Sequence, residues 1–329
     1  MKKPELFTVL PDYVCTPDGM EIDREGNLIV SCPNFAEKNW SGCMIKIDKN
    51  RKITKWFDVE AHPETGVARN MGIAFDKDYN LYICDNQGWS GEKEVIFKGR
   101  VLKVTFQEDG TVKETKVVAD RMEHPNGIRI RGEYMYLTQS CMERQKTESG
   151  KLMSCVYRFR LEDENIHVTN TLEDKNIFAT FITQNPDCQY GADGIAFDRE
   201  GNLYVGNFGD GEIVKIILDE KGDYVSQSSF AKDFSQMEST DGMTFDEKGN
   251  LYVADFCANA IAKITPDGKV SRYAQSPDCD GLDGGLDEPG EPIIWQGKLI
   301  ASCFDLVTGP GKINTGHEMP ATMSCLEIE

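Results

Sequence analysis

Short apolar segments alternate with polar turns along the chain, and this alternation recurs six times. A unit begins with an apolar segment such as GIAFD, passes through a turn rich in Asp, Gly and Asn, and continues with a second apolar segment such as NLYVGNF. Because these turn residues accept positive φ or bond their own backbone, each unit predicts a β-hairpin. The six hairpins open at Asp18, Asn70, Asn126, Asp193, Asp241 and Glu291.

Further strands follow each hairpin. A third apolar segment appears in most units, for example RVLKVTF from Arg100, and a fainter fourth follows, as in KITKWFD. Four strands in about fifty residues are typical of a propeller blade. About one more such interval separates the last unit from the first across the chain ends, so the segment ELFTVL is expected to complete the last blade and close the ring. The pattern predicts an all-β fold, with one domain over residues 1–329: a six-bladed β-propeller with four antiparallel strands per blade.

Composition and charge narrow the range of partners. Hydrophobic residues make up 40% of the chain and charged residues 28%, and the formal net charge is −19. Nucleic acids and anionic membrane surfaces attract positive patches, so neither is an expected partner. The N-terminal stretch MKKPELFTVLPDY lacks the apolar centre of a signal peptide, and the 11 cysteines form no C-x-x-C pair. We expect a cytoplasmic protein with free thiols, a monomer or a small homo-oligomer, that acts on a small molecule.

The residues that open the six hairpins point to a cation site. The first strand of each propeller blade lines the central channel, so these six side chains are expected to meet at one end of it. All six carry an oxygen, and four of them are carboxylates. Turn chemistry alone explains any single Asp-Gly or Asn-Gly pair, but it does not call for Glu291 before Pro292. Crowded carboxylates repel one another unless a cation neutralises them, and oxygen ligands suit Ca²⁺, Mg²⁺ or Mn²⁺.

Two motifs carry a family resemblance. They are HPNGI at residues 124–128 and DGIAFDREGNLYVGNF at residues 193–208. With these motifs the chain resembles the SMP-30/gluconolactonase/LRE-like family, and it is similar to the calcium-dependent lactonases and phosphotriesterases of that propeller superfamily. The resemblance implies one divalent metal ion, Ca²⁺ first and Mn²⁺, Mg²⁺ or Zn²⁺ as alternatives, held by a Glu, two Asn and an Asp. Matched by residue type, these ligands are Glu291, Asn70, Asn126 and Asp193.

The match departs from the family in one respect. The family's Glu belongs to the first blade, where this chain has Asp18. A ring has no absolute start, so shifting the chain break by one blade restores the family's cyclic order, and we prefer this shifted assignment. In this assignment Asp18 lies next to the metal without binding it directly, or it contacts the substrate. The unshifted assignment places the metal between four other residues, which are Asp18, Asn126, Asp193 and Asp241.

The resemblance also implies a reaction, the hydrolysis of a lactone or related cyclic ester. The metal would polarise the carbonyl, and Asp193 or Asp241 would act as general base. His124, two residues before Asn126, is a further catalytic candidate. Trp89 and Phe208 follow second strands, where they either wall a substrate pocket or pack between blades.

Other functions fit parts of the same pattern. A cyclic diketone or a phosphoester would place its developing charge on an oxygen in the same way, so C–C or phosphoester hydrolysis is an alternative. A non-enzymatic propeller of the NHL type that binds a protein or peptide is another. His62 and His317 lie in segments that could cover the channel, without further support for a catalytic role.

Overall fold

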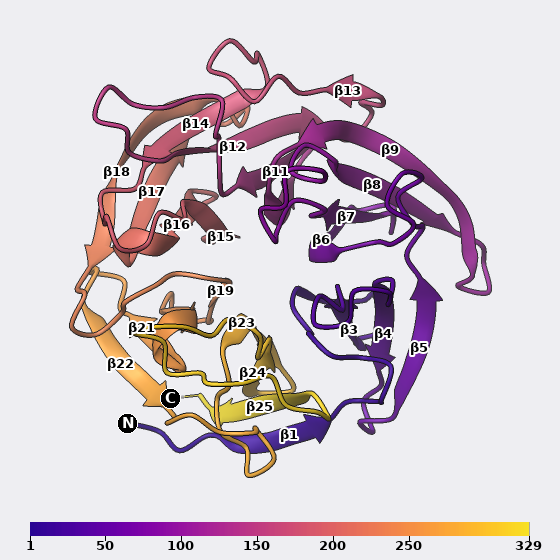
Figure 1. Ribbon diagram of the computed structural model, residues 1–329, viewed down its shortest axis with the longest axis vertical. Coiled ribbons are helices and arrows are strands. Elements are labelled where there is room, and N and C mark those ends of the chain that lie inside the picture. The colour runs from indigo at the N-terminus through magenta and orange to yellow at the C-terminus, as the bar shows by residue number, and fades with distance from the viewer. Residues whose placement is uncertain (329) are drawn as a thin grey trace.

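The strands form six sheets arranged in a ring around a central opening (Figure 1). The structure is a computed structural model that describes residues 1–328. Each sheet is a propeller blade of four antiparallel strands, and the six blades follow one another along the chain. The predicted six-bladed β-propeller is therefore confirmed.

The first three blades occupy the N-terminal half. Blade one contains β2 (Met20–Ile22), β3 (Leu28–Cys32), β4 (Cys43–Ile47) and β5 (Ile53–Asp58). Blade two contains β6 (Asn70–Phe75), β7 (Leu81–Asp85), β8 (Gly99–Phe106) and β9 (Val112–Met122). Blade three contains β10 (Pro125–Arg131), β11 (Tyr134–Gln139), β12 (Met153–Arg160) and β14 (Ile177–Ile182).

The other three blades complete the ring. Blade four contains β15 (Ala192–Phe197), β16 (Leu203–Asn207), β17 (Glu212–Leu218) and β18 (Tyr224–Lys232). Blade five contains β19 (Met243–Phe245), β20 (Leu251–Asp255), β21 (Ala260–Ile264) and β22 (Val270–Gln275). Blade six contains β23 (Pro289–Trp295), β24 (Lys298–Cys303), β25 (Thr322–Glu327) and, from the other end of the chain, β1 (Glu5–Val9).

The turn between the first two strands of a blade is built by one Asp and one Asn. In blade five, Asp246 Oδ1 accepts the backbone N–H groups of Lys248 and Asn250 at 2.8 Å, and Asn250 Nδ2 donates to Asp246 Oδ2 at 2.7 Å. Gly249, between them, has φ +81°, a left-handed conformation that glycine adopts without strain. Blades one, two and four repeat the Asp–Asn pair, which explains the recurring D-x-x-x-N-L pattern.

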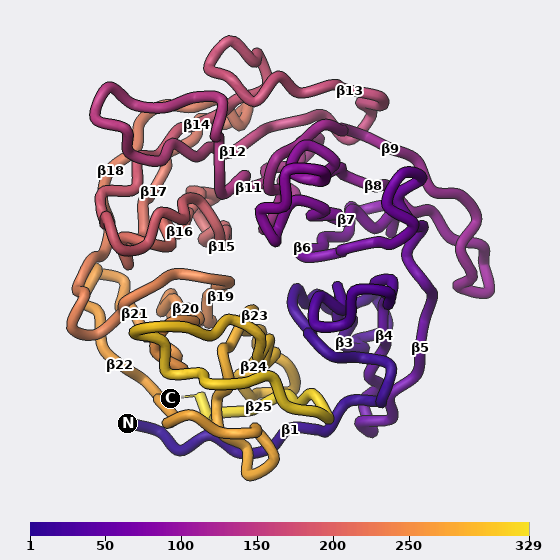
Figure 2. The backbone as a smooth tube through the Cα atoms, in the orientation of Figure 1, coloured from indigo at the N-terminus to yellow at the C-terminus, as the bar shows by residue number. Residues whose placement is uncertain are grey.

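The N-terminal strand closes the ring, as predicted. β1 pairs antiparallel with β25, so strands from opposite ends of the sequence lie side by side in this blade (Figure 2). Phe7 of β1 is buried and packs edge-on against Trp295 of β23, with ring centroids 5.8 Å apart.

The core is divided among the joints between blades. Six clusters of buried apolar side chains each join two consecutive blades. One of them joins blade six to blade one and includes Phe7 and Leu10. The inner strands of consecutive blades also contact one another all the way round. The joint at the chain ends is thus packed like the other five.

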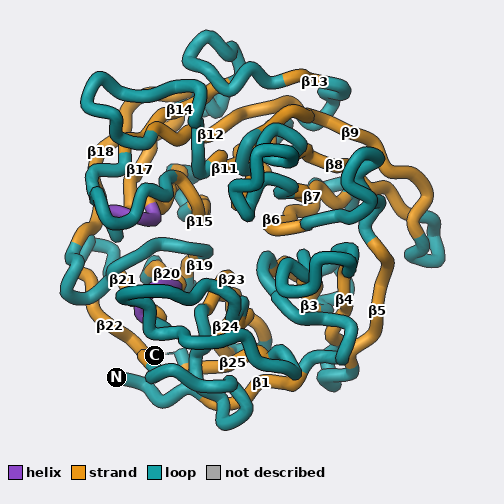
Figure 3. Tube along the Cα trace, in the orientation of Figure 1, coloured by secondary structure: helices purple, strands orange, loops and turns teal. Residues whose placement is uncertain are grey.

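A few elements fall outside the repeat (Figure 3). A two-residue strand, β13 (Ile166–His167), adds to the edge of blade two in parallel with β9. Two 3₁₀ turns, η1 (Phe208–Asp210) and η2 (Phe256–Ala258), follow the second strands of blades four and five. None of the helical segments in residues 1–328 has the length and apolar character needed to cross a membrane.

Candidate metal centre at the channel mouth

Glycines bring the inner strands close together around the channel. Gly194 of β15 is one of five glycines at this position, and a Cβ added to it would lie 1.9 Å from the Asp241 carbonyl oxygen of the next blade. A Cβ at the equivalent Gly127 would lie 2.8 Å from the Asp193 carbonyl oxygen. Neither glycine has positive φ, so they serve this close approach rather than a turn. The residue before each glycine is thereby held at the mouth of the channel.

A cavity of about 340 Å³ opens at this mouth. Its polar lining includes four of the residues that open the hairpins, namely Asp18, Asn126, Asp193 and Asp241. Aromatic side chains supply most of the remaining wall, namely Trp89, Tyr190, Phe208, Phe256 and Phe304. The cavity therefore combines oxygen-bearing side chains with a largely aromatic surface.

The three carboxyl groups that line the cavity are strongly perturbed. Burial, and then the charge of Glu291, raise the pKa of Asp18 to about 7. Burial and the neighbouring acids also raise the pKa values of Asp193 and Asp241 well above the usual range of a carboxyl. Within residues 1–328, no lysine or arginine forms an ion pair with these three groups, and no hydrogen bond reaches the carboxyl of Asp193. Such a set suits a divalent cation, which would replace the missing positive charge.

Glu291 lies beside this set but has a partner of its own. Its Oε1 forms an ion pair with Arg129 of β10, on the other side of the ring. The positive charge of Arg129 acts against the effect of burial, although the pKa of Glu291 remains above its usual value. Glu291 does not line the cavity. Arg129 therefore balances part of the charge of Glu291 without a metal.

Asn70, which was predicted as a metal ligand, does not line the cavity at the channel mouth. Its Nδ2 donates to Ser31 Oγ at 2.8 Å and to the Cys43 carbonyl at 3.1 Å, both in blade one. Met71 lines the cavity instead. Successive side chains of a strand point to opposite faces, so a shift of one residue turns Asn70 away from the channel axis. The placement of these residues favours the unshifted set over the set that includes Asn70 and Glu291.

His124 lies outside the cavity and contacts Tyr190, one of the residues that line it. It is buried, and burial lowers its pKa to about 4, so the imidazole is neutral. Its Nδ1 accepts from Asn86 Nδ2 at 2.9 Å and lies 3.3 Å from the Tyr190 hydroxyl. Asn126 Nδ2 donates to the same hydroxyl at 3.3 Å. His124 does not line the cavity. It orients Tyr190, and through Tyr190 it orients Asn126.

Trp89 and Phe208 line the cavity and also pack in the apolar cluster at the channel mouth. Sequence reasoning missed the other aromatic wall residues, although their signal is regular. An aromatic residue follows the second strand in most blades, and the five are Phe35, Trp89, Phe208, Phe256 and Phe304. Their side chains join one apolar cluster at the channel mouth.

Lys312 and Cys188, also missed, complete the rim of the cavity. Lys312 Nζ lies 3.3 Å from Cys257 Sγ. A hydrogen bond with Cys188 and the charge of Lys312 lower the pKa of the Cys257 thiol to about 6. No sequence motif marks these residues, because two long loops bring them together.

The remaining histidines lie elsewhere. His62 Nδ1 accepts from the Glu64 backbone within its own loop. His317 Nδ1 lies 2.5 Å from the Asp305 carbonyl oxygen in blade six. Neither lines the cavity.

Fold and site together define a six-bladed β-propeller with an acidic, aromatic-walled cavity at one end of its channel. The family model of the SMP-30/gluconolactonase/LRE-like region matches residues 210–280, in blades four and five. This match confirms the family resemblance for that part of the chain. No curated protein sequence matches the chain.

Solved structures with the same fold are similar along the whole chain. A luciferin-regenerating enzyme superposes with a TM-score of 0.63 at 13% identity, covering 100% of this chain and 96% of the other. A gluconolactonase of Xanthomonas campestris gives 0.62 at 14% identity, with 100% and 96% coverage. The calcium-binding protein regucalcin of Agrobacterium tumefaciens gives 0.61 at 13%, with 100% and 94% coverage. At these identities the similarity establishes the fold alone.

Proposed function

We propose that this protein is a metal-dependent hydrolase that opens a lactone or a related cyclic ester in the cavity at the channel mouth. One observation carries the proposal: Asp18, Asp193 and Asp241 are buried together at an aromatic-walled cavity without a basic partner among the described residues. A protein that only binds a peptide on its surface has no need to bury three uncompensated carboxyl groups.

The similarity to known proteins also supports a lactonase-like hydrolase. The matching family model includes gluconolactonases in its description, and one similar structure is a gluconolactonase. Another is described as a calcium-binding protein. Since these similarities are distant, the chemistry rests on the cavity itself.

The residues that would hold the metal are Asp18, Asn126, Asp193 and Asp241. Their donors are all oxygens, and the Tyr190 hydroxyl holds the Asn126 amide nitrogen, which leaves its Oδ1 for a ligand. Bound there, a divalent cation supplies the positive charge that polarises a carbonyl and stabilises a developing oxyanion.

The protein's own groups account for the other requirements of ester hydrolysis. With the carboxyl groups ionised, Asp241 or Asp193 accepts a proton from the attacking water as the water oxygen bonds to the carbonyl carbon. The ring C–O bond then breaks, and the same carboxyl returns the proton to the leaving oxygen. The aromatic wall binds the apolar face of the substrate and excludes other water. A cyclic diketone or phosphoester needs the same groups and belongs in the same substrate screen.

The deciding experiment compares two isosteric variants. Asp18→Asn should lower metal content and abolish lactone hydrolysis, because it removes a charged ligand. Glu291→Gln should retain the metal, since Glu291 is paired with Arg129. Metal content is measured by elemental analysis, and hydrolysis by a pH-indicator screen of lactones with and without EDTA.

Asp187→Asn is the control, because Asp187 is exposed on the loop before Cys188 and should leave both readouts unchanged. Loss of metal in Glu291→Gln with retention in Asp18→Asn would restore the shifted ligand set. Activity that survives complete removal of the metal would exclude the metal-dependent mechanism.

A further inference from the structure

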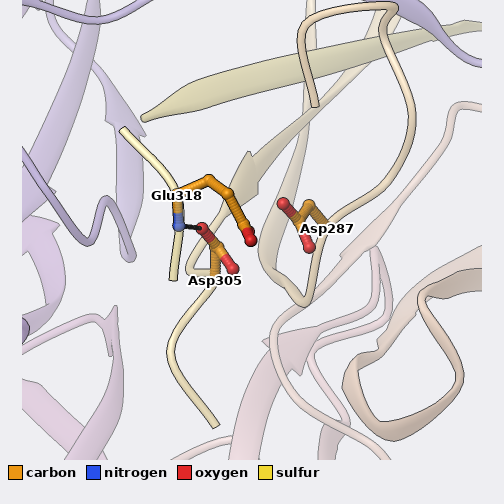
Figure 4. A group of neighbouring side chains, drawn as sticks. All are labelled: Asp287, Asp305 and Glu318. Carbon is orange, nitrogen blue, oxygen red and sulfur yellow. Dashed lines mark hydrogen bonds between the residues drawn. The ribbon is translucent and has the colours of Figure 1, made fainter. Parts of the chain in front are cut away.

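A second group of acidic side chains lies in blade six, outside the channel. Asp287 precedes β23, and Asp305 and Glu318 lie near opposite ends of the loop between β24 and β25, so two loops contribute the three carboxyl groups. Figure 4 shows the three carboxyl groups turned toward one another. Their ligand oxygens all lie within 4.8 Å of one another.

This spacing fits a calcium ion. Oxygen ligands bind Ca²⁺ at 2.3–2.6 Å, so two ligands of one ion lie at most about 5 Å apart. Ca²⁺ also accepts irregular geometry from loop residues, whereas Mg²⁺ requires nearly ideal octahedral ligands at about 2.0–2.1 Å. Three converging carboxylates from irregular segments therefore match Ca²⁺ better than Mg²⁺.

Several polar atoms of the cluster have no partner within the described chain. Asp287 is 2% exposed, faces the other two carboxyl groups, and has no hydrogen bond to its Oδ1. Glu318 Oε2 is also buried without a partner. Beside them, Asn314 is 2% exposed, and its Oδ1 has no donor. A buried acceptor without a donor is unfavourable unless something absent from the chain satisfies it.

The rest of the cluster is held in place. Asp305 Oδ2 accepts the backbone N–H of Glu318 at 2.7 Å, and Asp305 Oδ1 accepts from Asn314 Nδ2 at 3.1 Å. These bonds fix the relative positions of two carboxyl-bearing segments and leave the third, Asp287, facing them. The oxygens are therefore arranged before any ligand binds.

Local charge also calls for a cation. Within residues 1–328, no lysine or arginine pairs with the three acids, and His317, 3.4 Å from Asp305 Oδ2, is the nearby basic group. Burial and the charges of Asp305 and Glu318 raise the pKa of Asp287 to about 8.

We propose that Asp287, Asp305 and Glu318 bind a structural Ca²⁺ that ties the loop before β23 to the loop between β24 and β25. The second loop also carries Val307 and Lys312, which line the channel cavity. The ion would hold this loop against the propeller and so fix one wall of the cavity. The site uses none of the ligands at the channel mouth and stands whether or not the lactonase proposal holds.

The test is calcium titration of the full chain after dialysis against EDTA. Calorimetry with CaCl₂ alone gives stoichiometry and affinity, and thermal unfolding with and without CaCl₂ gives the stabilisation. Asp287→Asn and Glu318→Gln should each weaken calcium affinity at this site by about tenfold or more, or abolish its binding event. Both variants should also lose the calcium-dependent rise in Tm that this site provides.

Two matched variants separate this site from other effects. Asp283→Asn removes an exposed charge from the same loop but keeps the oxygen that accepts the Gly285 N–H, so binding should match the wild type. Asp193→Asn disables the channel site and should leave the blade-six event intact. If Asp287→Asn does not fold, Glu318→Gln still tests the proposal, because Glu318 is partly exposed and its substitution should be tolerated. Unchanged stoichiometry and an unchanged Tm response in Glu318→Gln would overturn the proposal, because the acids would then be sharing protons.

Discussion

Glu123 illustrates how a single buried carboxyl links stability to pH. It is fully buried, and both of its oxygens accept the backbone N–H of Glu143. Burial raises its pKa to about 7 against an ordinary value of 4.5. The folded protein thus holds this proton more tightly than the unfolded chain. The stability contributed by Glu123 is fully present below pH 4.5, and it is lost as the pH rises through about 7.

Glu123→Gln removes this titration while keeping one carbonyl oxygen for the Glu143 N–H. Relative to the wild type, the variant should gain stability as the pH rises from 5 to 8, by up to about 3 kcal/mol. Denaturant unfolding at both pH values measures the gain. Glu133→Gln, at an exposed position in the neighbouring hairpin, is the control and should show no such trend. A constant difference between wild type and Glu123→Gln across this range would contradict the prediction.

At the same scale, the site was only partly predictable from sequence. The repeat located Asp18, Asn126, Asp193 and Asp241 correctly at the cavity, because the glycine after each one marks the register. The same register places Met71 where Asn70 had been preferred for its oxygen. A residue with a suitable oxygen does not serve as a ligand if it lies one position out of register, because its side chain then points to the opposite face of the strand. Whether the four oxygens bind a metal stays a prediction.

Among the elements, β1 has the largest structural role for its length. Four of its five residues pair with β25, and Phe7, at the bulge between them, enters the cluster between blades six and one. Without β1, the edge of β25 and the apolar surface beneath it would be exposed, and open edges promote association between chains.

Phe7→Ala tests the role of β1 without removing the strand. Phe7 is 4% exposed, so truncation should lower the free energy of unfolding by about 3–5 kcal/mol. Val9→Ala, on the same strand but 38% exposed, should change it by less than about 1 kcal/mol. Deletion of residues 1–10 should go further and cause aggregation or a much lower Tm. Equal Tm values for Phe7→Ala and Val9→Ala would remove the argument for closure.

Strands were predicted better than the connections between them. The inner hairpins follow from alternation and from the Asp–Asn turns, which are local features. The loops that carry Tyr190 and Lys312 to the cavity have no such period, and β13 consists of two residues. Their positions depend on contacts between blades, which one stretch of sequence does not encode.

At the scale of the whole molecule, the glycines of the inner strands set the distance between blades. Gly194 leaves room for the Asp241 carbonyl, and its equivalents do the same for other blades. In a closed ring no blade can move outward alone. A change in the spacing between two blades is therefore expected to shift all the side chains at the channel mouth.

Gly194→Ala should therefore impair the cavity as well as stability. The new Cβ would lie 1.9 Å from a backbone oxygen, which forces β15 and β19 apart. We expect a loss of about 1–3 kcal/mol in unfolding free energy, together with weaker metal binding and activity. Gly249→Ala strains a surface turn at φ +81°, so it should lower stability while sparing the cavity. Equal losses of metal binding and activity in Gly194→Ala and Gly249→Ala would contradict the prediction that Gly194 sets the spacing at the channel mouth.

Ring closure by β1 and β25 also has a consequence for the timing of biosynthesis. Residues 5–9 leave the ribosome long before their partners at residues 322–327. At about 5–20 residues per second, the first strand waits for tens of seconds without its neighbour. During that interval the nascent chain carries an apolar segment, ELFTVL, whose native site does not yet exist. A molecular chaperone that shields extended apolar segments would protect the chain at this stage, and the need would end when the last blade forms.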